Sequence, residues 1–180
     1  PTNPNEFYGP YNGSDASEDG TFWTPPVRGD TAIIEYFTPT KTSSDKTPFK
    51  VLSIAHVYKD IMVEAAAGSC NLEVSSDWLN VAKSVGRIDF VSGSSVGLCT
   101  GTLLNNVAND QKPYFLTANH CISTQSSAQS ATVYWNYNTG DTPPGGTPST
   151  FGANLLATGA TSDFTLLFLT GSLPGGLFFS

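Results

Sequence analysis

The residue best suited to chemistry is a histidine at the end of an apolar run. His120 follows the segment Tyr114 to Ala118 and is itself followed by Cys121. A histidine at the end of a rigid strand can act as a general base, because a fixed imidazole keeps the geometry that proton transfer requires. A lone histidine in this position is more often structural, so the interpretation depends on a partner elsewhere in the chain.

A suitable partner is the aspartate that opens a later apolar run. Asp163 precedes the segment 164–169, which is otherwise apolar apart from Thr165. A carboxylate beside buried strands needs a hydrogen-bond donor, and an imidazole N–H is a natural one. In Ser-His-Asp chemistry the aspartate holds the imidazole in the correct tautomer and stabilises the imidazolium that forms. Alone, Asp163 would be an ordinary acid at a strand edge. Together, the two residues predict a catalytic pair.

The chain has three cysteines, Cys70, Cys99 and Cys121. Cys121 could connect the histidine corner to an earlier strand, and Cys99 lies in such a strand, 97–104. A bridge between them would close a loop of about 22 residues and stabilise the fold by about 3 kcal/mol in the chain-entropy account. The odd count leaves one cysteine without an internal partner. The chain has no C-x-x-C pair, which argues against a zinc ribbon or a thioredoxin-type site.

Two other patterns carry weaker interpretations. The segment 93–97 matches G-x-S-x-G, but a nucleophile elbow needs a strand–turn–helix setting and the chain order serine, acid, histidine. Here the order is serine, histidine, aspartate, and we expect the serine in a hairpin turn. His56 and His120 lack any metal-ligand spacing. The sequence therefore predicts neither a metal nor another cofactor.

The elements that must position the pair are short strands. After Cys70, apolar runs alternate with turn residues, which predicts an all-β barrel or sandwich. We expect the Pro- and Gly-rich segment 139–150 to be a loop, and 77–83 to be a short helix capped by Ser76 or Asp77. The predicted strands are 85–90, 96–104, 114–118, 132–137, 154–158 and 164–169.

The N-terminal part differs from the rest of the chain in its residue composition. Residues 1–20 are rich in Asn, Gly, Pro, Asp and Ser and indicate a loop. The β-branched and aromatic segments 31–38 and 49–58 predict two paired strands. Residues 62–69 are small and polar, which indicates a linker or a processing region. We therefore expect a small β-containing N-terminal extension.

Composition excludes several classes of partner. The formal net charge is −7 over 180 residues, and such an acidic surface repels phosphate backbones, so we expect no nucleic-acid partner. No apolar run is long enough to span a membrane. The chain starts at Pro1 without an initiator Met or a signal peptide, and it ends in the apolar run 176–180. We expect a fragment cut at both ends.

Four segments, in order along the chain, resemble the lysyl endopeptidase family of secreted bacterial serine proteases. They are 97–106, 117–121, 133–137 and 162–167, and the similarity runs from about residue 68 to 180. The resemblance implies that residues 68–180 form an antiparallel Greek-key barrel, the first of the two barrels of a trypsin-like protease. Residues 1–67 are more weakly similar to the end of that family's pro-region. A stable N-terminal extension that is never removed is the alternative.

The resemblance also implies a role for each candidate residue. His120 is the general base, Asp163 is its orienting acid, and Cys99 and Cys121 form the bridge beside the histidine. Cys70 would pair with a cysteine in a missing C-terminal barrel and is unpaired here. The implied partners are that barrel and a protein or peptide substrate, and the implied location is extracellular.

The chain departs from the family at the nucleophile. After Asp163 the only serines are Ser172 and Ser180, and neither stands in a Gly-Asp-Ser-Gly-like turn. We therefore expect this chain alone to be inactive, and lysine specificity cannot be carried over. The alternatives are a catalytically inactive protease homologue, a secreted β-domain that serves as a binding module, or an unrelated β-sandwich adhesin.

Overall fold

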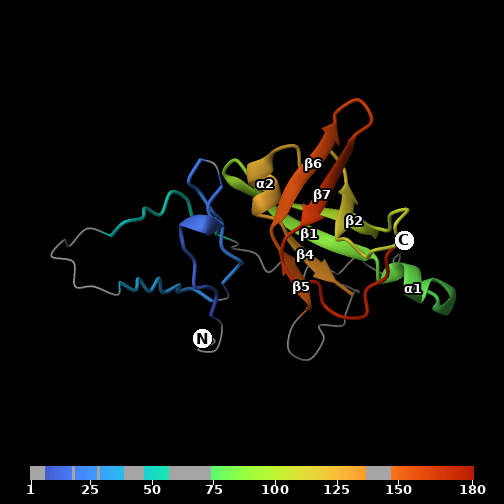
Figure 1. Cartoon of the computed structure of the whole chain (residues 1–180), viewed down its shortest axis with the longest axis horizontal. Coiled ribbons are helices and arrows are strands. Elements are labelled where there is room, and N and C mark those ends of the chain that lie inside the picture. The colour runs from blue at the N-terminus through green and yellow to red at the C-terminus, as the bar shows by residue number, and fades with distance from the viewer. Residues whose placement is uncertain (1–6, 18, 28, 39–46, 57–73, 137–146) are drawn as a thin grey trace.

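The protein is mostly β, with one antiparallel sheet that curls strongly into a half-barrel (Figure 1). The computed structural model describes residues 7–17, 19–27, 29–38, 47–56, 74–136 and 147–180. The sheet has seven strands: β1 Val85–Ser92, β2 Ser95–Leu104, β3 Tyr114–Thr117, β4 Thr132–Trp135, β5 Ser149–Phe151, β6 Ala153–Gly159 and β7 Phe164–Leu169.

The strand order confirms the predicted Greek-key architecture. The sheet runs β5-β4-β1-β2-β3-β7-β6, and every adjacent pair is antiparallel. Within it, the order β4-β1-β2-β3 is that of a Greek key, in which the fourth strand returns beside the first. Each of the six apolar runs forms a strand. The expectation of a loop over 139–150 was wrong at its end, because Ser149 and Thr150 pair with β4 as the start of β5.

The core follows from the alternation of buried and exposed residues along the strands. Along β7, Thr165, Leu167 and Leu169 are buried, whereas Leu166 and Phe168 between them are partly exposed. The centre is an edge-to-face contact between Phe115 and Trp135, whose ring centroids are 5.6 Å apart. Residues of β1, β2, β3, β4, β6 and β7 contribute to this core, so it includes side chains of both strands that lead to the candidate residues, β3 and β7.

The helices are short. The predicted helix at 77–83 is present as the 3-10 turn η2, Ser76–Trp78, followed by α1, Leu79–Ala82. Its predicted cap was wrong, since Ser75 stands at the N-cap and makes no side-chain cap bond. The helix α2, Gln125–Gln129, lies between β3 and β4. None of the helices among the described residues has the length and apolar character needed to cross a membrane.

The two strands predicted in the N-terminal part were wrong. The described residues of 31–38 and 49–56 form no strand, and residues 57 and 58 lie outside the described part. Ile33 is 88% exposed and Ile54 is 82% exposed, so neither segment lies against a core. Strand propensity reflects packing against neighbouring strands and a half-buried surface, which these segments lack. The regular structure described before residue 74 is the 3-10 turn η1, Gly13–Asp15.

Candidate active site

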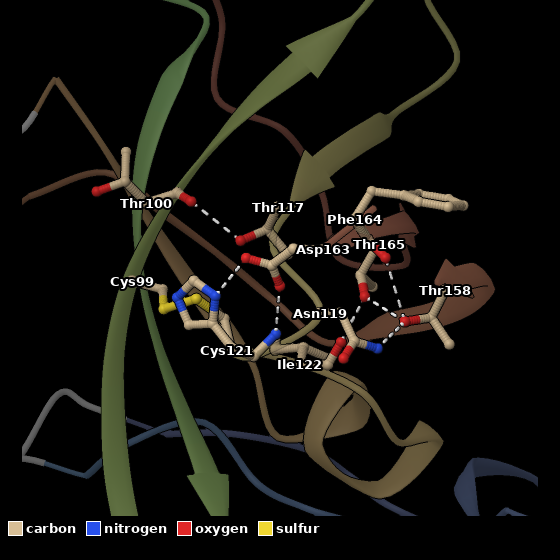
Figure 2. Close-up of polar contacts among 11 residues, drawn as sticks. Cys99, Thr100, Thr117, Asn119, Cys121, Ile122, Thr158, Asp163, Phe164 and Thr165 are labelled. Atoms are coloured by element: carbon tan, nitrogen blue, oxygen red, sulfur yellow. Dashed lines mark hydrogen bonds and ion pairs between the residues drawn. A yellow bond between two sulfur atoms is a disulfide. The ribbon is translucent and has the colours of Figure 1, made fainter. Parts of the chain in front are cut away.

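The pairing of β3 with β7 brings the two candidate residues to one end of the sheet. These strands are antiparallel, and Thr117 lies opposite Thr165. The end of β3 therefore lies beside the start of β7. His120 is in the turn that follows β3, and Asp163 immediately precedes β7. Figure 2 shows Asp163 at this corner, with Thr117 and Thr165 on the adjoining strands.

His120 and Asp163 are joined by two hydrogen bonds. Oδ2 of Asp163 lies 2.7 Å from Nδ1 of the imidazole, and Oδ1 accepts from the backbone N–H of His120 at 2.9 Å. An ionised carboxylate can only accept, so Nδ1 carries the proton of the neutral ring and Nε2 keeps its lone pair. The His120 side chain is 71% exposed. The arrangement is that of a base whose accepting nitrogen can be reached from solvent.

The electrostatics favour an ionised Asp163. The backbone N–H of His120 is the largest influence that lowers the pKa of this carboxyl, and the imidazole hydrogen bond is the next. Both stabilise the charged form, which accepts hydrogen bonds better than the acid does. Asp163 is therefore ionised at neutral pH.

The local backbone also suits an aspartate at this position. Asp163 ends the turn between β6 and β7, and its backbone N–H donates to the carbonyl of Ala160 at 3.3 Å. Its φ is +48°, in the left-handed region that aspartate and asparagine tolerate better than most side chains. The residue that supplies the carboxylate is thus also one that fits the end of this turn.

The predicted bridge between Cys99 and Cys121 is confirmed. It joins β2 to the residue after His120, with the two Cα atoms 6.3 Å apart. Ligand atoms of Cys99, His120 and Cys121 lie within 4.8 Å of one another, a spacing that resembles a metal site. The two sulfur atoms are bonded to each other, however, so neither is available as a thiolate ligand. Cys70 lies outside the described residues, and its pairing stays a prediction.

Comparison with known proteins identifies the family. Residues 65–180 match the family described as "Lysyl endopeptidase, C-terminal domain". The chain belongs to the lysyl endopeptidase family. Residues 4–58 match the "Lysyl endopeptidase N-terminal domain". A lysyl endopeptidase of Pseudomonas aeruginosa is 30% identical over 191 residues, which cover 93% of this chain and 41% of the relative. The chain thus spans less than half the length of that relative.

In this member of the lysyl endopeptidase family, the serines that follow Asp163 lie far from His120. At about 3.3 Å per residue, β7 carries the chain roughly 20 Å away from Asp163 before Ser172 is reached. The carbonyl of Ser172 accepts from Thr150 of β5 at 3.1 Å. Ser180 donates through Oγ to the carbonyl of Leu103 at 2.8 Å. Among the described residues, no hydrogen bond joins the His120 ring to a serine hydroxyl.

The G-x-S-x-G segment also fails to provide a nucleophile. Its serine, Ser95, begins β2 directly after the two-residue turn Gly93-Ser94 and pairs with Ser92 across the hairpin. The predicted hairpin is therefore present, but Ser95 lies in β2 and not in the turn, and the strand–turn–helix setting of a nucleophile elbow is not present. Along β2, Ser95 lies about 13 Å from Cys99, the residue bonded to the histidine corner.

A hollow in the described chain lies apart from the histidine. It is lined by Gln111, residues 173–177 and Phe179. These C-terminal residues follow β7 at the end opposite Asp163. His120 does not line the hollow, and its side chain is exposed at a corner of the sheet.

Sequence reasoning missed the polar residues behind the pair. The Asn119 side chain donates to Oγ1 of Thr158 at 2.7 Å, and Thr158 Oγ1 lies 2.6 Å from Thr165 Oγ1. Thr165 Oγ1 in turn donates to the carbonyl of Ile122 at 2.6 Å. The signal that could have found them is Thr165 itself, a polar residue at an inward position of an otherwise apolar strand.

Proposed function

We propose that this chain supplies the base and the orienting acid of a serine endopeptidase that cleaves peptide bonds by acyl transfer. The observation that carries the proposal is the 2.7 Å contact between Nδ1 of His120 and Oδ2 of Asp163, which leaves Nε2 free to accept a proton. Membership of the lysyl endopeptidase family supports a protein or peptide as the substrate.

The chemistry follows from this geometry. A serine hydroxyl loses its proton to Nε2 of His120 while its oxygen attacks the scissile carbonyl carbon. His120 then gives that proton to the leaving amine, and an acyl-enzyme remains. A water molecule repeats the sequence and releases the acid product. Asp163 stays ionised throughout and stabilises the imidazolium, which is why its lowered pKa matters.

The serine and the oxyanion hole belong, in this proposal, to a second barrel outside the chain. Two observations support this: the chain covers 41% of its Pseudomonas aeruginosa relative, and Ser172 lies beyond the far end of β7. Residues 68–180 are then the first barrel, and residues 1–67 are the end of a pro-region or an N-terminal extension. The Cys99–Cys121 disulfide supports an extracellular location, because such bonds persist in oxidising compartments.

The test is covalent labelling of the longer gene product with a fluorophosphonate, together with hydrolysis of a peptide amide. We expect His120→Ala to abolish both. Ser172→Ala is the matched control and should keep both, because Ser172 is not the nucleophile. The 180-residue chain alone should not be labelled. Labelling of that chain that depends on His120, or loss of labelling in Ser172→Ala, would place the nucleophile inside the chain. A folded full-length protein that neither labels nor cleaves would show an inactive homologue.

A further inference from the structure

A second set of hydrogen bonds connects the two ends of the histidine turn without touching the imidazole. It begins at the side chain of Asn119, immediately before His120, and ends at the carbonyl of Ile122, two residues after it. Between these ends it passes through Thr158 of β6 and Thr165 of β7 (Figure 2). The same β6–β7 hairpin carries Asp163 in its turn.

Donor counting assigns a direction to these bonds. The Ile122 carbonyl can only accept, so the single hydroxyl proton of Thr165 points to it at 2.6 Å. In the 2.6 Å contact between the two threonines, Thr158 is therefore the donor and Oγ1 of Thr165 is the acceptor. The other acceptor near Thr158, the carbonyl of Phe164, is more distant at 3.2 Å. Oγ1 of Thr158 accepts in turn from Nδ2 of Asn119. The protons therefore run in one direction, from Asn119 through Thr158 and Thr165 to Ile122.

Burial makes the last bond of this series costly to lose. Thr165 and Ile122 are both fully buried. A buried carbonyl without a donor is strongly disfavoured. The Thr165 hydroxyl is therefore held in its hydrogen bond to the carbonyl of Ile122. Strand register makes the arrangement possible, because Thr165 lies directly opposite Thr158 on one side and Thr117 on the other. Chains of hydrogen bonds in the protein interior also polarise and strengthen one another.

We propose that Asn119, Thr158 and Thr165 are positioning residues for the His120–Asp163 pair. Their directed hydrogen bonds hold both ends of the histidine turn against the hairpin that carries the carboxylate. They thereby set the separation and the angle between Nδ1 and Oδ2. The proposal rests on the proposed function for its catalytic consequence, but the alignment of the pair can be measured without turnover.

The decisive variant is Thr165→Val in the full-length protein, which keeps the shape of the side chain and removes its hydroxyl. Thr165→Ser is the rescue variant, because it restores the hydroxyl. Thr150→Val is the matched control. Thr150 is also almost fully buried, and its hydroxyl also donates to a backbone carbonyl, but that carbonyl belongs to Ser172 at the far end of β7.

Two measurements read out the effect. The first is the downfield proton resonance of the His120 Nδ1–H bonded to Asp163, assigned by its absence in His120→Ala. The second is the separate determination of kcat and KM. We expect Thr165→Val to broaden or shift the resonance and to lower kcat about 10- to 100-fold, the scale of a displacement of about 1 Å in a catalytic group. KM should change little. Thr165→Ser should restore both readouts, and Thr150→Val should leave both unchanged.

Three results would overturn the proposal: an unchanged resonance and kcat in Thr165→Val, no rescue by Thr165→Ser, or an equal effect of Thr150→Val. If Thr165→Val does not fold, Thr158→Val decides by the same readouts, since Thr158 is exposed at the edge of the sheet. If the full-length protein has no peptidase activity, the proposed function fails. The Nδ1–H resonance still decides whether these residues align the pair.

Discussion

Asp163 is bound by two different groups of His120: one carboxylate oxygen accepts from the backbone N–H at 2.9 Å and the other contacts the ring Nδ1 at 2.7 Å. The backbone bond fixes the carboxylate relative to the main chain, and the ring bond fixes the imidazole relative to the carboxylate. The direction of Nε2 is therefore set by the main chain of the histidine turn. Both bonds stabilise the ionised carboxylate and lower the pKa of Asp163.

Replacing the carboxylate should remove catalysis while keeping the fold. In Asp163→Asn, the new NH₂ group can donate to Nδ1, which leaves the ring proton on Nε2, where it blocks proton transfer. We expect kcat of the full-length protein to fall about 10⁴-fold at neutral pH. Asp110→Asn is the control, because Asp110 bonds Asn106 and Lys112 in another loop. Activity of Asp163→Asn close to that of the control would contradict the assigned role of Asp163.

The pKa of Asp163 should respond only in part to removal of the imidazole. The largest cause of its lowering is the backbone N–H of His120, which survives in His120→Ala. Titration of the carboxyl carbon by NMR should place the midpoint lowest in the wild type and higher, but still below 3.8, in His120→Ala. The lowered pKa of Asp110 should stay the same in both proteins, since its main cause is the Asn106 side chain. A midpoint that returns to 3.8 in the variant would show that the ring bond alone matters.

The same shift has a defined sign in the pH dependence of stability. The pKa of Asp163 is lower in the folded state than the ordinary value of 3.8, so the unfolded chain binds its proton first as pH falls. The stabilisation by the carboxylate is therefore present above pH 3.8 and is lost as pH falls through the folded pKa. Urea unfolding of the wild type and Asp163→Asn should show a stability difference at neutral pH that shrinks in this acid range. A difference that stays constant would argue against the linkage.

The disulfide should stabilise the domain through the loop that it closes. Cys99 and Cys121 are 22 residues apart, and in the chain-entropy account such a bridge contributes about 3 kcal/mol. Urea unfolding of the double variant Cys99→Ala/Cys121→Ala should show a loss of about that size. A reducing agent should lower the stability of the wild type and leave that of the double variant unchanged. Equal sensitivity of both proteins to the reductant would contradict this assignment.

A methyl group at Gly101 should disturb the packing between β2 and β3. A Cβ there would lie 2.3 Å from the Phe115 ring and 2.5 Å from the backbone carbonyl oxygen of Leu116. The carbonyl cannot rotate away as a side chain could, so we expect Gly101→Ala to lower the unfolding free energy by about 1–3 kcal/mol. Gly175→Ala is the control, because no atom lies within 4 Å of its added methyl. Urea unfolding of both variants checks the prediction, and equal stabilities would refute it.

Local patterns in the sequence were sufficient for much of the fold. The apolar runs predicted six of the strands, because alternation of burial is a property of each strand by itself. The corner around His120 and the acid before 164–169 were recognisable because each is a short motif. The segments 31–38 and 49–56 show the limit of this reasoning. They have the composition of strands, but their described residues pair with no strand. Residue composition alone does not determine whether a neighbouring strand is present.

The tertiary structure alone decided how the site is held. His120 and Asp163 are 43 residues apart, and their contact depends on the register that sets Thr117 opposite Thr165. A slip of one residue would turn Thr165 out of the core and remove its bond to Ile122. The sequence determined which groups could do chemistry, because that is a property of residue type. Their alignment was decided by pairing between distant strands, because hydrogen-bond geometry depends on positions in space and not on proximity along the chain.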